Sequence, residues 1–138
     1  MRPANSADRA LLHDHVTLGL AELVSGRGGL NYASDLAGFL GTNVDALESA
    51  IVESVIGHGL VTDGGFGVAT NGLALIYVHP NFRRQRIGTS IYAALQEQGP
   101  IELWAKPGDR TAKSFAESLG LKARLLVMSA EQDPNDEG

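Results

Sequence analysis

The segment from Val78 to Gly88 has residue types and a spacing that could bind a phosphate group. It reads Val-His-Pro-Asn-Phe-Arg-Arg-Gln-Arg-Ile-Gly, so a basic loop follows an apolar strand that ends at a proline. The residues after the loop have helical periodicity, and the first turn of a helix exposes unpaired N–H groups at the positive end of its dipole. A strand, a basic loop and a helix N-terminus together predict a pyrophosphate site. The alternative is an ordinary loop with solvated arginines.

Individual residues of this segment would have different roles in such a site. Gly88 would allow the backbone to approach the ligand closely, and Thr89 and Ser90 add hydroxyl donors in the first helical turn. The cluster of cations is too short to follow a nucleic acid duplex, but it suits one compact polyphosphate. Its members lie within four residues: Arg83, Arg84 and Arg86.

The first half of the chain is predicted to be helical. Apolar residues recur at helical spacing and glycines follow each run. Ser34 can cap the second helix, and Thr42 or Asn43 the third. The predicted helices span residues 8–24, 35–40 and 44–55.

The pattern changes to strands after Gly59. Short apolar runs are separated by Asp63-Gly64-Gly65 and by Asn71-Gly72, and the second pair is typical of a type I′ hairpin turn. The predicted strands span residues 60–62, 66–70 and 73–79, then 101–105 and 125–128. Helices are predicted at 84–98 and from Asp109, a capping residue, to Leu119. The fold class is therefore α/β, with a β-meander and then a β-α-β-α-β unit in a mixed sheet, preceded by a helical region.

The basic segment resembles the acetyl-CoA-binding motif of the GNAT acyltransferases. That motif reads Gln/Arg-x-x-Gly-x-Gly/Ala after a Val-x-Pro strand exit, and here it is Arg83-Arg84-Gln85-Arg86-Ile87-Gly88. Arg86 replaces the first glycine of the motif. If this position requires a positive φ, Arg86 carries backbone strain that glycine would not.

A second motif follows at the expected distance. Residues 110–121 resemble the next helix of the family, with matches at Ala112, Phe115 and Gly120. Leu121 replaces the usual final phenylalanine, and Ala116 stands where the family often has a general-acid tyrosine. Residues 101–128 are also similar to the non-catalytic half of mycothiol synthase. The resemblance covers residues 73–128.

The resemblance implies an N-acetyltransferase that uses acetyl-CoA as acyl donor for an unidentified amine on a small molecule or a protein. Backbone N–H groups of residues 84–89 would bind the pyrophosphate, and the pantetheine would pair with the strand edge at residues 76–78. The implied cofactor-binding residues are Ile76, Tyr77, Val78, Arg83, Arg84, Gln85, Arg86, Ile87, Gly88, Thr89, Ser90 and Phe115. A base, a backbone N–H that polarises the thioester and an acid would complete the mechanism.

Three residues are candidates for proton transfer. His79 would lie beside the thioester, and its alternative role is that of a strand-end histidine before a proline. Tyr92 could donate a proton or pack against its neighbours, and Glu102 is the nearest carboxylate on its strand. Trp104 is expected in the core, although it could line the acceptor pocket. We find no metal-ligand spacing in the sequence.

The first half resembles a winged helix, a module found in small bacterial regulators and in the dimerisation domains of some methyltransferases. Residues 34–41, a helix from Val44 and residues 58–61 follow that order before a two-stranded wing. We therefore predict a helical region at 1–58, an acetyl-CoA-binding region at 59–130 and a disordered acidic tail at 131–138. An acyl-CoA-responsive regulatory or dimerisation protein without catalysis is the alternative function, and a non-catalytic half-domain that only holds a partner is a third.

The sequence also suggests how the protein assembles and where it is found. The region before the meander shows no strand signal, which predicts an uncovered sheet edge. With the apolar stripe of residues 44–55, that edge predicts a homodimer formed through the first ~75 residues. The chain has no cysteine and no apolar run long enough to span a bilayer. We expect a cytoplasmic protein that does not associate with membranes.

Direct DNA binding is not expected. No lysine or arginine occurs from Gly28 to Phe82, and the would-be recognition helix carries Asp45, Glu48 and Glu53. Neutralising phosphates requires cations along the interface. We predict no measurable affinity for duplex DNA at moderate salt. A salt-dependent mobility shift of a DNA fragment would contradict this.

Overall fold

The computed structural model describes residues 1–128, so the predicted acidic tail at 131–138 lies outside the described residues. The strands are β1 (Arg2–Pro3), β2 (Leu60–Thr62), β3 (Gly65–Thr70) and β4 (Leu73–Val78). The helices are α1 (Arg9–Val24), α2 (Gly29–Phe39), α3 (Leu47–His58), α4 (Ile87–Gln96) and α5 (Arg110–Ser118). None of the described helices combines the length and the hydropathy that a membrane crossing requires.

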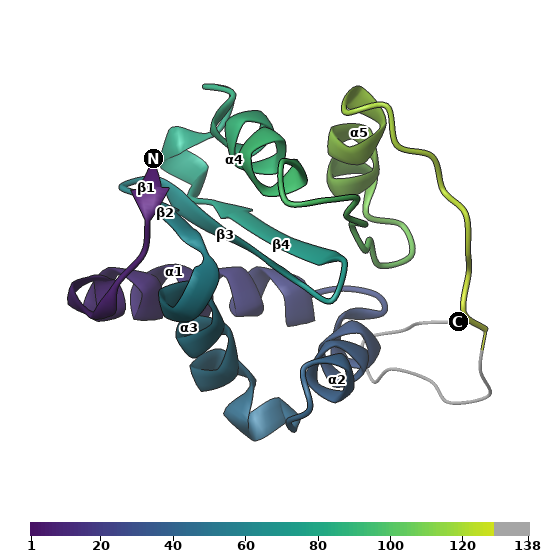
Figure 1. The fold of residues 1–138 in the computed structure, drawn as a ribbon. Helices are drawn as coiled ribbons and strands as arrows, with labels where there is room; N and C mark the ends of the chain where they lie inside the picture. Colours follow the sequence, from purple (N-terminus) through teal and green to yellow (C-terminus); the bar gives the residue numbers. More distant parts are fainter. Residues whose placement is uncertain (129–138) are drawn as a thin grey trace.

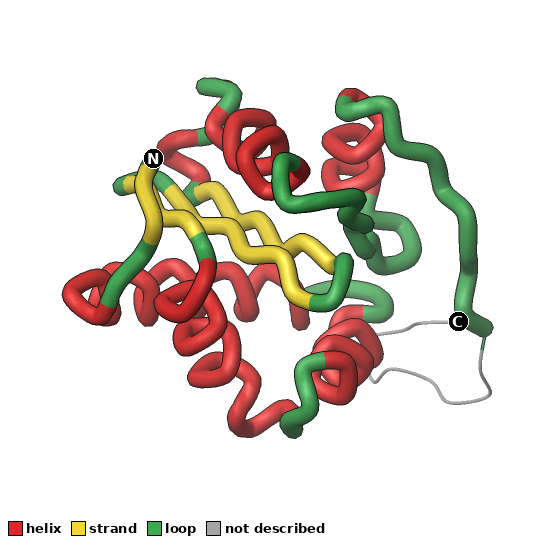
Figure 2. The backbone as a smooth tube through the Cα atoms, in the orientation of Figure 1, coloured by secondary structure: helices red, strands yellow, loops and turns green. Residues whose placement is uncertain are grey.

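The four strands form one antiparallel sheet in the order β1-β2-β3-β4 (Figure 2). The predicted hairpin turn is confirmed, because Asn71 and Gly72 have φ values of 49° and 83°. The strands between residues 60 and 78 are therefore continuous in a single sheet. The likeness of the helical region to a winged helix stays a prediction.

Helices cover both faces of the sheet (Figure 1). Helices α1 and α3 pack on one face, α2 packs against α1, and α4 lies on the other face. Residues along β4 alternate between these layers, as in any strand. Leu73 and Tyr77 belong to the core shared with α1, α2 and α3, whereas Ala74 packs with Ile91 and Leu95 of α4.

Two of the predicted strands are not formed. Residues 101–105 contact β4 only through a parallel bridge between Glu102 and Leu73. Residues Leu125–Met128 are extended but belong to no strand, and their side chains are 78–86% exposed. The sheet is therefore antiparallel with one parallel contact, rather than the predicted mixed sheet. The apolar run at 125–128 was misleading because no neighbouring edge pairs with it.

A strand is present where none was predicted. β1 pairs with β2, and Ala4 N–H donates to the Gly59 carbonyl at 3.0 Å. Polar contacts hold it in place: the guanidinium of Arg2 donates to both carboxylate oxygens of Asp8 and lowers the pKa of Asp8 to about 2. Asn5 accepts from Ala7 N–H. These contacts leave no signal in the hydrophobic pattern.

Two features from which the sequence predicted a homodimer, an open sheet edge and an exposed apolar stripe, are not present in the described residues. β1 covers the β2 edge that was expected to be open. The apolar stripe on α3 faces the interior of the same protomer, with Leu47, Ile51, Val52 and Val55 all at most 5% exposed. A homodimer stays a prediction without these two supports.

Helix boundaries differ from prediction by three residues or more in three helices. α3 spans Leu47–His58 rather than 44–55, because residues 44–46 form a separate 3-10 turn. α2 begins at Gly29 rather than at residue 35, because Gly28 adopts the left-handed conformation (φ 76°) and turns the chain directly from α1 into α2. α4 begins at Ile87 rather than at residue 84, because Arg84 and Arg86 have positive φ values of 67° and 61°. The predicted cap at Asp109 is confirmed, and Asn43 caps the 3-10 turn at residues 44–46 that leads into α3. The predicted cap at Ser34 is wrong, because Ser34 lies inside α2.

We predict that Gly67→Ala destabilises the fold, because α4 packs directly on this point of β3. A Cβ at Gly67 would lie 2.2 Å from Ile91 Cγ2 and 3.3 Å from Leu95 Cδ1. Urea unfolding should show a loss of about 1–3 kcal/mol. The control is Gly57→Ala, where a Cβ meets nothing within 4 Å and helix propensity should add up to about 1 kcal/mol. If Gly67→Ala and Gly57→Ala changed the free energy of unfolding equally, α4 would be able to move away from the sheet at little cost.

Candidate functional site

A cleft of about 740 Å³ lies beside β4. Its walls come from α1, α2, β4, the start of α4, the segment Leu103–Lys106 and α5. One side of the cleft carries the basic loop that the sequence singled out, and the other side reaches the core residues Leu36 and Ile51. The cleft therefore passes from one face of the sheet to the other.

The cleft exists because the chain after Glu102 separates from β4. Glu102 N–H donates to the Gly72 carbonyl at 2.7 Å, and Ala74 N–H donates to the Glu102 carbonyl at 2.9 Å. Beyond this point the described backbone makes no further hydrogen bond between β4 and Leu103–Lys106. β4 and the chain after Glu102 therefore diverge, and the opening lies between them. We call residues Leu103–Lys106 the separated arm.

Side-chain contacts hold the separated arm against α1 and α2. Lys106 Nζ donates to three carbonyls at the C-terminus of α1, including that of Leu23 at 2.9 Å. Tyr32 Oη donates to the Trp104 carbonyl at 3.3 Å, and the two rings meet edge to face at 5.9 Å. The cation satisfies carbonyls that have no partner within the helix and favours the negative end of its dipole.

β4 therefore presents a free backbone edge to the cleft. Alternate residues of a strand direct their N–H and C=O groups to the same edge, and Ala74 directs its own to Glu102. Ile76 and Val78 share this orientation and so face the separated arm. The Val78 carbonyl accepts from Arg83 Nε at 2.9 Å, which leaves the N–H groups of Ile76 and Val78 available.

The basic loop leads into α4 through a strained backbone. Arg84 and Arg86 both have left-handed φ values, so the conditional expectation of strain at Arg86 is confirmed. Within the described residues neither arginine forms an ion pair. Ser90 N–H is the first of the helix to bond within it, to the Arg86 carbonyl at 3.0 Å. The N–H groups of residues 87–89 are therefore open to a ligand.

Gly88 is held close to α5. A Cβ at Gly88 would lie 3.2 Å from the ring of Phe115 and 3.6 Å from Val78 Cγ2. The ring of Phe115 thus covers the first turn of α4 and places α5 at the mouth of the cleft. The two sequence motifs, residues 83–88 and 110–121, meet at this contact.

Most of the predicted cofactor-binding residues line the cleft. They are Ile76, Tyr77, Val78, Arg83, Arg84, Arg86, Ile87, Gly88, Thr89 and Phe115. Gln85 and Ser90 do not line it. Arg83 is already engaged: its guanidinium donates to both carboxylate oxygens of Glu22, at 3.1 and 2.8 Å. The charge available to a ligand therefore comes from Arg84 and Arg86.

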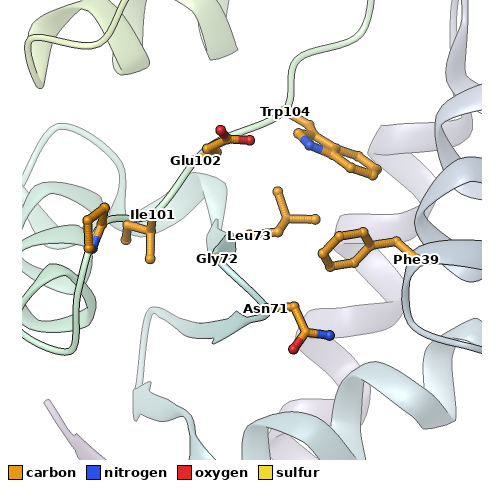
Figure 3. A pocket seen from close by; sticks show the side chains of 8 residues that line it. Phe39, Asn71, Gly72, Leu73, Ile101, Glu102 and Trp104 are labelled. Carbon is orange, nitrogen blue, oxygen red and sulfur yellow. The ribbon is translucent and has the colours of Figure 1, made fainter.

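The three predicted catalytic residues lie outside the cleft. His79 accepts from Asn81 N–H through Nδ1 and contacts Phe82. Tyr92 is buried on α4, with 5% exposed. Glu102 lines a separate pocket of about 290 Å³ with Phe39, Trp104 and Asn71 (Figure 3), and its carboxylate pairs with Arg124.

Sequence reasoning missed several residues of the cleft wall. Glu22, Tyr32, Lys106 and Asp109 all line it. They come from α1, α2 and the separated arm, so no local pattern connects them with the basic loop. Only the Asp109 cap had a sequence signal, as the residue that starts α5.

Burial shifts the pKa values of three ring-bearing side chains near the cleft. It raises the pKa of Tyr32 to about 12 and also raises the pKa of Tyr77. It lowers the pKa of His15, whose ring packs 5.8 Å from that of Tyr77. The Tyr77 hydroxyl is buried without a hydrogen-bond partner among the described residues. At neutral pH these three side chains are therefore uncharged.

The comparison with protein families agrees with this geometry. A model of the acetyltransferase (GNAT) family matches residues 30–121, which include α2, the sheet from β2 to β4, the basic loop and α5. The chain belongs to the GNAT acetyltransferase family. Searches of curated proteins and of solved structures find no significant match.

Backbone strain at Arg86 should be measurable. We predict that Arg86→Gly is more stable than Arg86→Ala by about 1 kcal/mol, because both remove the side chain but only alanine keeps the left-handed cost. Urea unfolding of the two variants checks this. At Gln85, which is not in the left-handed region, the order should reverse, since glycine only adds freedom to the unfolded chain. The same order at both positions would contradict the assignment of strain.

Proposed function

We propose that the protein binds acetyl-CoA in the cleft and transfers the acetyl group to an amine. The observation that carries this proposal is the combination of two unpaired donor sets at one opening. The N–H groups of residues 87–89, with Arg84 and Arg86 beside them, suit a diphosphate. The edge N–H groups of Ile76 and Val78 suit an extended, amide-bearing arm that pairs like a strand.

Different residues of the cleft would bind the diphosphate and the acetyl thioester. Bound acetyl-CoA would supply the acetyl thioester. The first turn of α4 holds the negatively charged end, and the absence of a side chain at Gly88 makes room for the ring of Phe115 against that turn. The N–H of Ile76 points into the opening between β4 and the separated arm, where it can donate to a carbonyl oxygen as negative charge develops there. The apolar walls beyond it exclude water.

The site fits the donor with one adjustment. Arg83 Nε occupies the Val78 carbonyl, so a ligand that pairs with both polar groups of Val78 would displace this contact. Arg83 would keep its ion pair with Glu22, since the two bonds use a different nitrogen. A donor that pairs through the N–H groups alone leaves Arg83 in place.

We predict that acetyl-CoA binds and that Arg84→Glu weakens binding tenfold or more by calorimetry. The substitution places like charge beside the diphosphate and removes a charge-assisted bond worth roughly 1.5–3 kcal/mol. It also keeps a non-glycine residue at the left-handed φ, so backbone strain is unchanged.

The control is Arg124→Glu, which makes the same charge change at a residue that does not line the cleft. It should leave acetyl-CoA affinity within about twofold, since exposed charges at this separation are screened. Equal losses in both variants would place the diphosphate elsewhere. Acetyl-CoA binding without transfer to any amine would favour the acyl-CoA-responsive, non-catalytic alternative.

A further inference from the structure

The part of the cleft that faces α1 and α2 is an aromatic chamber. It is formed by Leu20, Leu23, Tyr32, Phe66, Tyr77 and Trp104. Two aromatic pairs contribute to it: Phe66 and Tyr77 meet at 6.0 Å on neighbouring strands, and Tyr32 and Trp104 meet at 5.9 Å between α2 and the separated arm. Such walls favour a flat ring, which can pack edge to face or offset against them.

The carboxylates that line the described cleft are already engaged. Glu22 binds Arg83 through both oxygens, at the rim rather than in the chamber. Asp109 caps α5 by accepting from Ala112 N–H at 3.0 Å. A primary ammonium that entered the chamber would lose its hydration and meet no free anion, which is costly.

The side chains that line the chamber also offer no base at neutral pH. Tyr32 and Tyr77 stay protonated because burial raises their pKa values. His15 packs against Tyr77, but it does not line the cleft, and its Nδ1 is buried. Lys106 Nζ is fully used on the α1 carbonyls. Arg83, Arg84 and Arg86 at the other side of the cleft are cations and repel an ammonium.

We propose that the acceptor is a weakly basic aromatic amine of the aniline class, which is neutral at pH 7 and binds its ring in the aromatic chamber. This inference rests on the proposed function and adds the substrate class to it. An amine that is already neutral needs no protein base before it attacks.

The transfer balances without a further reactant. The lone pair of the amine nitrogen forms the N–C bond to the thioester carbonyl, and the C–S bond breaks as its electron pair goes to sulfur. The nitrogen loses one proton to water after attack, when it has become strongly acidic. The CoA thiolate takes up one proton from solvent. The products are an anilide and free CoA.

Binding can be tested without turnover. Trp104 is the single tryptophan of the chain and lines the chamber, so its fluorescence reports entry directly. The probes are 4-methylaniline and benzylamine, which are isomers with the same ring but differ in charge at pH 7. With CoA present, 4-methylaniline should quench Trp104 and saturate, at an affinity tenfold or more above that of benzylamine. Tighter binding of benzylamine would overturn the proposal.

Turnover supplies the second readout. The chain has no cysteine, so a thiol reagent reports only released CoA. With acetyl-CoA, kcat/KM for 4-methylaniline should exceed that for benzylamine and spermidine by tenfold or more at pH 7. It should stay flat from pH 7 to 9, whereas the benzylamine value should rise roughly tenfold per pH unit as the neutral amine forms.

A pair of variants locates the ring. Leu20→Phe fills part of the chamber and should lower kcat/KM for 4-methylaniline at least fivefold, with acetyl-CoA affinity unchanged as proof of folding. Leu18→Phe makes the same change on an exposed position of α1 outside the cleft and should have no effect.

The outcomes separate the two proposals. Failure of acetyl-CoA to bind would overturn the proposed function. Normal acetyl-CoA binding with faster transfer to benzylamine or spermidine, or with transfer to none of the three amines, would overturn the aromatic acceptor alone.

Discussion

The functional architecture depends on where Lys106 places its ammonium group. Nζ binds carbonyls at the C-terminus of α1, and this fixes the chain after Glu102 to the α1–α2 layer instead of to β4. Two hydrogen bonds at Glu102 hold the other end to the sheet. Because one end is tied to the sheet and the other to the helices, the intervening backbone cannot complete a strand, and the edge of β4 stays open. The cleft is the space between β4 and this segment, which is attached to the sheet at Glu102 and to α1 at Lys106.

The second constraint is the backbone of the basic loop. Two arginines adopt left-handed φ values within three residues, each at a cost of about 1–2 kcal/mol relative to an unstrained residue. Glycine would remove the strain but also the positive charge. The loop thus combines a turn geometry that suits glycine with side chains that suit a diphosphate. Contacts of Arg83 with Val78 and Glu22 connect this loop to both β4 and α1, so the strained segment is supported from two sides.

Charged side chains are unevenly distributed along the cleft. The cationic groups gather at the start of α4, and Glu22 at the rim is paired with Arg83. Farther in, the walls are aromatic and aliphatic, and burial keeps Tyr32 neutral. This distribution of charge favours the proposed arrangement, with the diphosphate of acetyl-CoA at the start of α4 and a neutral acceptor at the far side of the cleft.

The sequence by itself determined the local elements and located the basic loop that we propose as the phosphate-binding part of the site. Helical periodicity located α1 and α3, Asn71-Gly72 located the β3–β4 hairpin, and the basic motif located the loop before α4, because each of these depends on residues close in the chain. The requirement for positive φ at Arg86 could also be inferred from one missing glycine. β1 could not, since it depends on the contact of Arg2 with Asp8 and on pairing with a strand almost sixty residues away.

Tertiary structure decided whether an apolar run becomes a strand and which side chains share the cleft. Residues 101–105 and 125–128 have strand-like sequences, but a strand forms only where a neighbouring edge can pair with it, and Lys106 and Tyr32 draw the first of these runs away. Glu22, Tyr32 and Trp104 come from three distant segments, so their meeting depends on how α1 and α2 pack. His79, Tyr92 and Glu102 have the chemistry of catalytic groups, yet their positions direct them elsewhere. Residue type is a property of the sequence, whereas the direction in which a side chain points is set by the packing of the whole chain.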